Sequence, residues 1–450
     1  MDKKRLYILG EMKVSKAILQ LAIPTILGMV VQILYNLTDT FFVGKLNDPY
    51  QVAAVTITLP IFMMQMALSG IFGNGAASYI SRLLGEKNYA GARTTATLAW
   101  LCTAIVSVLV SILGIVLLPS ILKASGASDN TFGFAASYLT IIFAGSIVSM
   151  LNFTTSQMIR AEGAAKYALM GMLLGTGTNI ILDPIFILWM HQGVKGAAIA
   201  TVIGNGVALC YYLSFYLRGK SLAAPALKYL SLQWSTLKEI LKIGFPSSLS
   251  QFMMSVGNAI SYHIASGYGD NTVAAMGVAM RVFTIPIFIF IGLAIGVQPL
   301  IGYSYGAGNK LRLKHVLNTA IAYALVLSFV FTLLFALFSK YTMIIFIKNP
   351  EVVAIGSQIL RVYTFAIIFA AVQMQFGSGL QAMGKGMASF ILSISRMGLI
   401  YIPAIILLNK FFGFNGMILA LPLTDFLTTG LAFGFIYKIL VNVEKEHEPA

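Results

Sequence analysis

Residues 21–44 read LAIPTILGMVVQILYNLTDTFFVG, an apolar stretch with a proline near its start and a single acid, Asp39, near its end. Between Ala17 and Phe42 no other charged side chain occurs. A helix of about 26 residues, rising roughly 1.5 Å per residue, is long enough to cross a bilayer with some tilt. The stretch therefore predicts a membrane-spanning helix that carries a carboxylate inside the membrane.

Asp39 is the first candidate for a functional side chain. A charged group at the centre of a bilayer costs about 3 kcal/mol or more, so an acid inside a membrane helix is a functional-site hypothesis. Tyr35 and Asn36 lie about one turn before it, on the same side of the helix. Pro24 removes a backbone donor and offers a bend. The pattern favours a moving helix that binds a ligand; alternatively, Asp39 hydrogen-bonds a neighbouring helix and stabilises the bundle.

The composition indicates an integral membrane protein. Of 450 residues, 58% are hydrophobic and 10% are charged, whereas soluble domains have about 45–50% apolar and about 25% charged residues. The net charge of +15 does not indicate nucleic-acid binding, because Lys and Arg gather in short loops and at the termini rather than on one face. The sequence also lacks a GxxxxGK[ST] loop and an HExxH motif, so we expect neither an ATP-driven pump nor an enzyme, and no cofactor.

Twelve apolar segments follow one another along the chain, and each predicts a membrane-spanning helix. Basic residues cluster at the N-terminus and in alternate loops, above all in 218–242, which by the positive-inside rule places both termini in the cytoplasm. We expect a multi-pass protein of the plasma (inner) membrane that works as a monomer. The predicted spans are 17–42, 52–83, 93–119, 131–158, 167–190, 194–217, 240–266, 273–303, 314–338, 352–378, 388–410 and 414–438.

The two halves of the chain resemble each other at a nearly constant offset. Gly75 and Gly296 lie 221 residues apart, as do Gly163 and Gly384. Six spans per repeat is an even number, so the repeats have the same orientation, and such an architecture is typical of transport by alternating access. We predict an all-α protein of two parallel six-helix repeats, with an N-terminal lobe at 1–217, a cytoplasmic linker at 218–239 and a C-terminal lobe at 240–450.

The fifth and sixth spans carry a second group of polar residues. Asn179 and Asp183 lie one turn apart on one face, and Pro184 breaks the helix ladder beside the carboxylate. Ala197 and Thr201 belong to a small and polar stripe on the next span. Together with Asp39 these residues offer oxygens for Na⁺ or paired carboxyls for a proton. Alternatively, Asp183 caps a broken helix and Asn179 links two helices.

Other polar residues in the predicted spans have more than one interpretation. Asp425 in the last span is equally compatible with a structural role and a functional one. Arg281 and Arg396 are candidates to pair with it, and His263 is a candidate proton-binding group. Flexible thioethers and aromatic rings suit a pocket for varied apolar or cationic ligands. The candidates for lining a substrate cleft are Gln32, Met63, Met64, Met66, Met253, Met254, Asn258 and Tyr262.

Several motifs resemble those of one transporter family. LAIP and DTFFVG occur in the first span, RLLGEKNY follows the second, and IRAEG follows the fourth. NIILDP lies in the fifth, GVKGAAIAT begins the sixth, and QAMGKG follows the tenth. The chain as a whole is similar to the MATE (multidrug and toxic compound extrusion) family, and within it to the MepA-like bacterial branch.

The resemblance implies a V-shaped bundle that exports lipophilic or cationic organic compounds in exchange for Na⁺ or H⁺. It places a cation site of the N-terminal lobe at Asp39, Asn179, Asp183 and Thr201, with the Ala197 carbonyl nearby and Tyr35 in the first-helix polar network. Other members carry acids in the seventh and tenth helices, where this chain has Met254 and Ala370. The partners implied are small organic molecules and the lipid bilayer.

Two other functions fit the same architecture. A flippase for a lipid-linked saccharide or a cell-wall precursor would need several Arg or Lys residues along its cleft, and the membrane-embedded arginines here are few. A passive channel would need a continuous polar stripe, which the isolated acids do not form. A cation-coupled multidrug antiporter is the function that the sequence favours.

Overall fold

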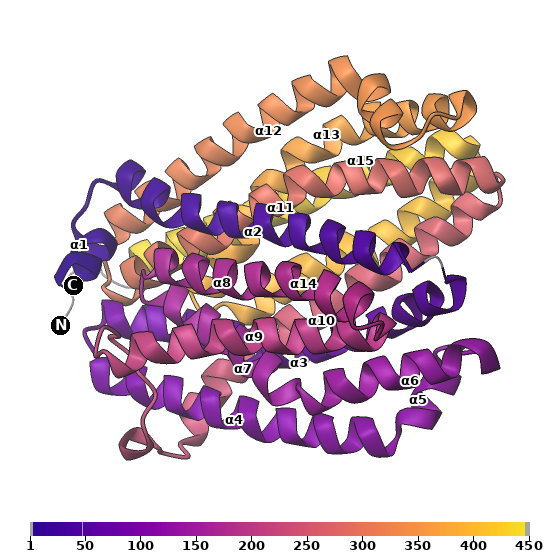
Figure 1. Cartoon of the computed structure of the whole chain (residues 1–450). Coiled ribbons are helices and arrows are strands. Elements are labelled where there is room, and N and C mark those ends of the chain that lie inside the picture. Colours follow the sequence, from indigo (N-terminus) through magenta and orange to yellow (C-terminus); the bar gives the residue numbers. More distant parts are fainter. Residues whose placement is uncertain (1–2, 47, 446–450) are drawn as a thin grey trace. The chain divides into compact units, whose positions relative to one another are not determined.

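The computed structural model describes residues 3–46 and 48–445, and throughout them the regular structure is helical (Figure 1). Nine helical segments of this described part are long and apolar enough to cross a membrane, or ten when α6 (Asp129–Ala144) and α7 (Ser146–Ala161) count as one bent span. The segment Gly386–Lys438 covers the last two predicted spans. The prediction of an all-α, multi-pass membrane protein is confirmed.

The chain divides into two compact units. Unit 1 comprises residues 1–11 and 27–248, and unit 2 comprises residues 12–26 and 249–450. Two helices, α2 (Val14–Gly44) and α10 (Trp234–Ser266), contribute to both units. The other helices of unit 1 are α1 (Lys3–Gly10), α3 (Pro49–Gly85), α4 (Tyr89–Val116), α5 (Leu118–Ala124), α6, α7, α8 (Ala165–Asp183), the π-helix η1 (Pro184–Trp189), α9 (Gly193–Leu217) and the 3₁₀-helix η2 (Leu227–Tyr229). Those of unit 2 are α11 (Asp270–Gly306), α12 (Lys310–Phe346), α13 (Pro350–Ala382), α14 (Gly386–Ile394), the π-helix η3 (Ser395–Leu399) and α15 (Tyr401–Lys445).

The points at which α2 and α10 pass between the units lie beside prolines. In α2 the passage falls between Ile26 and Leu27, shortly after Pro24, and in α10 it falls between Ser248 and Leu249, shortly after Pro246. A proline in a helix removes one backbone hydrogen bond and favours a kink. Each helix therefore carries a proline, which favours a bend, close to where it changes unit.

Glycines allow the first halves of α2 and α10 to pack closely against neighbouring helices of the same unit. In unit 2 a Cβ on Gly296 would lie 2.5 Å from the α-carbon of Ala22 in α2. In unit 1 a Cβ on Gly244 of α10 would overlap the Ile71 carbonyl of α3. Only glycine allows backbones to approach this closely. The first half of α2 is thus packed into unit 2, and the first half of α10 into unit 1.

The fourth predicted span is bent. α6 and α7 meet at Gly145 at an angle of 54°. A Cβ on Gly145 would lie 2.4 Å from a methyl group of Val202, so α9 packs against the break. The last two predicted spans are likewise separated within α15 at Gly413, whose φ of +56° is a conformation that glycine adopts readily.

The predicted linker is fixed to the same end of unit 1 as α1. Glu162, fully buried after α7, accepts hydrogen bonds from Arg5 of α1 at 3.1 Å, from the Ser221 hydroxyl at 2.6 Å and from the Leu222 amide at 2.6 Å. Farther along the linker, Arg93 donates to the Tyr229 hydroxyl at 2.7 Å, and this hydrogen bond lowers the pKa of Tyr229. We call this end of unit 1 the α1 end.

Candidate functional site

Asp183 lies at the junction of an α-helix and a π-helix. α8 ends at Asp183, and Pro184 opens η1, in which the Met190 amide donates to the Ile185 carbonyl at 2.8 Å. Proline cannot continue the α-helical ladder, and the wider π turn accommodates the break. The carboxylate is fully buried, so the sequence NIILDP places a charge where backbone bonding is already interrupted.

Asn179 joins Asp183 to α9. With its amide nitrogen turned toward Asp183, that nitrogen lies 3.1 Å from Asp183 Oδ2 and its oxygen accepts from the Thr201 amide at 3.0 Å. With the amide turned the other way, the nitrogen donates to Thr201 Oγ1 at 3.4 Å. Either orientation connects α8 with α9 at Thr201, and the three side chains are buried.

A pair of glycines permits this connection. A Cβ on Gly175 of α8 would lie 2.8 Å from the Gly204 carbonyl, and a Cβ on Gly204 of α9 would lie 2.7 Å from the Gly175 carbonyl and 3.1 Å from Cβ of Asn179. The helices therefore pack backbone to backbone at this level. This close approach brings the short side chain of Asn179 within hydrogen-bonding range of Thr201.

The first-helix residues reach the same place. The Tyr35 hydroxyl lies 3.5 Å from Thr201 Oγ1. Asp39, half-buried on α2, is close enough to Tyr35 and Asp183 to act on both electrostatically. Asn36 accepts from Gln32 at 3.3 Å one turn earlier. The structure therefore brings together Tyr35, Asp39, Asn179, Asp183 and Thr201, all within unit 1.

Tyr138 of α6 also belongs to this group, although no sequence pattern singles it out. Its ring packs in a small apolar cluster with Ala197, and its hydroxyl is in electrostatic range of Asp39 and Asp183. Ala197 itself is buried one turn before Thr201. Tyr138 comes from a helix whose sequence carries no acid near it and no recurring polar spacing, which explains why it was missed.

One oxygen of this site has no protein partner. Asp183 Oδ1 is buried and accepts no hydrogen bond from the described residues. An unpaired buried carboxylate oxygen costs free energy unless a proton or a cation satisfies it. Carboxylate, amide and hydroxyl oxygens are the ligands that hard cations prefer. The described residues hold no cluster of three His, Cys, Asp or Glu side chains of the kind that binds transition metals.

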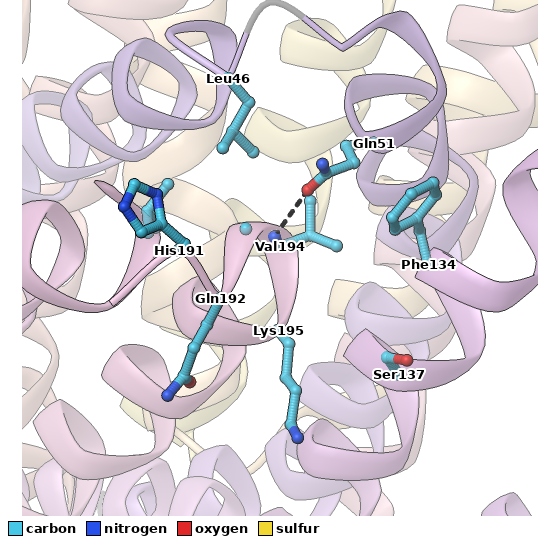
Figure 2. Close-up of a pocket in the computed structure, with 10 residues that line it drawn as sticks. Leu46, Gln51, Phe134, Ser137, His191, Gln192, Val194 and Lys195 are labelled. Atoms are coloured by element: carbon cyan, nitrogen blue, oxygen red, sulfur yellow. Dashed lines mark hydrogen bonds between the residues drawn. The ribbon is translucent and has the colours of Figure 1, made fainter. Parts of the chain in front are cut away.

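A cavity of about 320 Å³ lies beyond η1. Figure 2 shows Gln51 accepting from the Val194 amide at 3.1 Å at the start of α9, with Phe134 and Ser137 of α6 and His191 among the lining residues. Neither Asp39 nor Asp183 is among the residues that line it. The cavity is therefore a neighbour of the acid site and is separate from it.

The substrate-cleft candidates differ in exposure within their units. Met63, Met64, Met254, Asn258 and Tyr262 are exposed. Gln32, Met66 and Met253 are partly buried. Exposed methionines are available to a ligand, but nothing in either unit assigns these residues to a substrate, so their role stays a prediction.

Unit 2 holds a different buried charge. Arg396 of η3 donates to the two oxygens of Asp425 at 2.6 and 3.2 Å, and both side chains are buried. Of the two arginines considered for Asp425, the structure thus selects Arg396. Arg281 interacts instead with Tyr262, and His263 is exposed. Met254 is exposed and Ala370 is buried, and neither can ionise.

Comparison with known proteins identifies the family. The MatE family model matches residues 24–185 and, 222 residues later, residues 246–407. The chain belongs to the MatE family. The double match agrees with the six-helix repeat predicted from the glycine positions. Members of this family are transporters rather than enzymes, so the chain is a multi-pass membrane transporter of a multidrug export family.

Curated relatives and solved structures of MATE proteins match over nearly the whole chain. The multidrug export protein MepA of Staphylococcus haemolyticus is 29% identical over 440 residues, covering 98% of this chain and 97% of the relative. MepA of Staphylococcus saprophyticus is 30% identical with the same coverage. An outward-facing multidrug resistance MATE transporter of the MOP superfamily has a TM-score of 0.93 at 28% identity, covering 98% of this chain and 99% of that one. A MOP superfamily transporter from Pyrococcus furiosus, described as having a binding pocket of reverse polarity, has a TM-score of 0.92 at 27% identity and 99% coverage of both chains.

Proposed function

We propose that this protein exports lipophilic or cationic organic compounds in exchange for H⁺ or Na⁺, by alternating access and as a monomer, with both termini in the cytoplasm of a cell whose plasma membrane it spans. The coupling cation binds in unit 1 at Asp39 and Asp183, with Asn179, Thr201 and Tyr35 completing the site. The named relatives are multidrug export proteins, which supports organic substrates.

One observation carries the position of the coupling site. Two carboxylates from α2 and α8 converge with amide and hydroxyl groups inside one unit, and Asp183 Oδ1 has no partner among the residues that the structure describes. A proton or a Na⁺ ion supplies the missing positive charge. By contrast, the buried acid of unit 2 is already neutralised by Arg396, so it has no need of a cation.

The energy available to such a site is sufficient for coupled transport. One charge that crosses a potential of 100 mV yields about 2.3 kcal/mol, and a tenfold concentration gradient adds about 1.4 kcal/mol. Binding at Asp39 acts on α2, which continues through Pro24 into unit 2. Solved MATE structures described as bent and straight conformations support the idea that this fold takes two states.

Dye efflux from inverted vesicles, with a pH gradient and a Na⁺ gradient imposed separately, tests the proposal. We expect Asp39→Asn and Asp183→Asn each to lower gradient-driven efflux at least tenfold, because an amide cannot take up the cation's charge. The matched control is Asp425→Asn, which changes a buried acid outside the site; it weakens the pair with Arg396 and should lower stability, but the folded variant, compared at equal amounts in the membrane, should retain gradient-driven efflux. Wild-type efflux from Asp39→Asn together with loss in Asp425→Asn would place the coupling site in unit 2.

Resistance of an efflux-deficient host tests the substrate class. Expression should raise resistance to ethidium-like dyes. If the protein is confirmed in the membrane and resistance is unchanged, the proposal of drug export is wrong and the alternative function as a flippase gains support.

A further inference from the structure

α7, α8 and α9 pack against one another in unit 1, as Figure 1 shows. On α9, Thr201, Asn205, Tyr212 and Tyr216 follow one another at intervals of four, seven and four residues, so they lie on one face of the helix. On α7, Ser149, Asn152 and Ser156 follow one another at intervals of three and four residues and also share a face. From Thr201 to Tyr216 the helix α9 rises about 22 Å. This contact, which we call the α7–α9 seam, consists of Ser149, Asn152 and Ser156 on α7 and Thr201, Asn205, Tyr212 and Tyr216 on α9.

The seam begins at the acid site. Thr201, which contacts Asn179 and Tyr35 through its hydroxyl, accepts from Asn205 Nδ2 through its carbonyl at 3.0 Å. Asn205 Oδ1 accepts from Asn152 at 2.8 Å, and its amide nitrogen also lies 3.3 Å from Ser149 Oγ. With the Asn179 amide nitrogen turned toward Asp183, hydrogen bonds link Asp183 to Asn179 and Asn179 to the Thr201 backbone, and from Thr201 they continue through Asn205 to Asn152 in the middle of α7.

The seam continues toward the α1 end. Ser156, one turn beyond Asn152, lies 3.4 Å from the Tyr212 hydroxyl, which donates to the Ala168 carbonyl of α8 at 2.8 Å. Ala168 and Ala208 are small and buried beside this level. One turn farther, Tyr216 is in electrostatic range of Glu162, the carboxylate that joins α1 and the linker to unit 1.

Four buried polar atoms on or beside this line have no partner within the described part of the chain. They are Asp183 Oδ1, Asn152 Oδ1, Thr155 Oγ1 and the Tyr216 hydroxyl. Buried polar atoms in native proteins are nearly always satisfied, and where protein atoms do not satisfy them ordered water does. Three such atoms on α7 and α9, with a fourth on Asp183 of α8 at one end of the seam, indicate a row of bound water molecules rather than a dry interface.

We propose that the α7–α9 seam is a hydrated path along which protons pass between Asp183 and the α1 end of unit 1. The inference rests on the proposed coupling at Asp39 and Asp183. The charged and titratable groups that face the path are Asp39 and Tyr35 of α2 and Tyr138 of α6 at one end, Arg160 of α7 beside Tyr212, and Arg5 of α1 and Glu162 at the other.

The transfer conserves atoms and electrons. The Asp183 O–H bond breaks and leaves its electron pair on the carboxylate, while a new O–H bond forms on the adjacent water. That water passes a different proton to the next one, and no group is oxidised or reduced. The amides of Asn152 and Asn205 and the hydroxyls of Ser149 and Ser156 orient the waters and carry no charge themselves, so they are positioning residues.

Radiolytic hydroxyl-radical labelling of the full-length protein, read by mass spectrometry, tests the hydration without any transport. Tyr212 and Tyr216 are only 1% and 9% exposed, yet each should be labelled at least tenfold faster than Tyr363, a tyrosine of unit 2 that is 1% exposed, as Tyr212 is, and that packs on Phe283. Asn152→Leu fills the path with an apolar group of similar size and should return both rates to that of Tyr363. Labelling of Tyr212 and Tyr216 no faster than Tyr363 in the wild type would show a dry seam and overturn the proposal.

A matched variant separates this path from the general polarity of α7. Thr154 is also buried on α7, but it faces Thr103 and the Ser69 carbonyl on the opposite side. Thr154→Val should leave both labelling rates unchanged. If Asn152→Leu does not fold, judged by its thermal unfolding in detergent, Ser156→Val replaces it with the same expectation.

Transport by the same variants tests the proton role. Under a pH gradient, Asn152→Leu should export dye at least tenfold more slowly than the wild type while its dye binding is unchanged, and Thr154→Val should match the wild type. Wild-type export from a dried Asn152→Leu variant would overturn proton passage through the seam. Absence of wild-type export under both a pH gradient and a Na⁺ gradient would instead contradict the proposed coupling, whereas wild-type export under a Na⁺ gradient alone would overturn proton passage through the seam.

Discussion

At the scale of single residues, each unit buries one acid beside a π-helical turn, and the two acids are satisfied differently. Asp183 immediately precedes η1, whereas Arg396 lies within η3 and pairs with Asp425. A π turn widens the helix and is frequent at functional positions. In unit 1 one oxygen of Asp183 has no partner among the described residues, whereas in unit 2 the Arg396 guanidinium pairs with both oxygens of Asp425.

The Arg396–Asp425 pair predicts a strong dependence of stability on both partners. Arg396→Met or Asp425→Leu alone should lower the free energy of unfolding by about 3–5 kcal/mol, because each leaves an unpaired buried charge. The double variant should recover most of that loss, since no charge then remains. Reversible unfolding in mixed detergent micelles measures the three values. A double variant as unstable as the sum of the two single variants would show that the residues act independently.

At the scale of helices, the close packing of α8 and α9 depends on individual glycines. Gly175→Ala should destabilise the protein by roughly 1–3 kcal/mol, as overpacking does, because the added Cβ would lie 2.8 Å from the Gly204 carbonyl and 2.9 Å from Cβ of Ala208. It should also weaken cation coupling by moving Asn179 away from Thr201. Thermal unfolding and gradient-driven dye efflux measure the two effects.

Gly177 provides the control within the same helix. A Cβ there would meet no atom within 4 Å, so Gly177→Ala should stabilise the protein slightly or leave it unchanged, since alanine favours a helix over glycine by about 1 kcal/mol. Equal destabilisation by both alanines would mean that the loss comes from glycine flexibility and not from helix contact.

The helices themselves could be predicted largely from hydropathy, and parts of the site from spacing. Asn179 and Asp183 share a face because they lie four residues apart, and Pro184 marked the break that became η1. The sequence could not show that Gly145 bends the fourth span, since the bend depends on Val202 of a later helix. For the same reason Tyr138 and Asn152 were missed: long-range packing alone brings them to the site and to the seam.

At the scale of the whole molecule, α2 and α10 join the two units beside Pro24 and Pro246. Pro24→Ala would restore a backbone donor and make a bend of the first helix at this point less favourable. We expect the variant to bind dye as the wild type does and to export it several-fold more slowly, as measured in proteoliposomes. Pro422, which lies within α15 and at neither passage in the sequence, supplies a control whose replacement by alanine should affect export less. Equal slowing by both would assign the effect to helix stiffness in general.

The first half of α2 packs in unit 2 and the first half of α10 packs in unit 1, and this exchange bears on how such a chain arose. Residues 12–26 belong with the second repeat, and the first part of α10 belongs with the first repeat. An ancestral six-helix chain with this packing would have needed a second copy to complete it, in the manner of a domain-swapped dimer. Fusion of two such copies into one chain would make that intermolecular exchange intramolecular. A present-day chain cleaved within the linker should accordingly yield two halves that fold only when they are synthesised together.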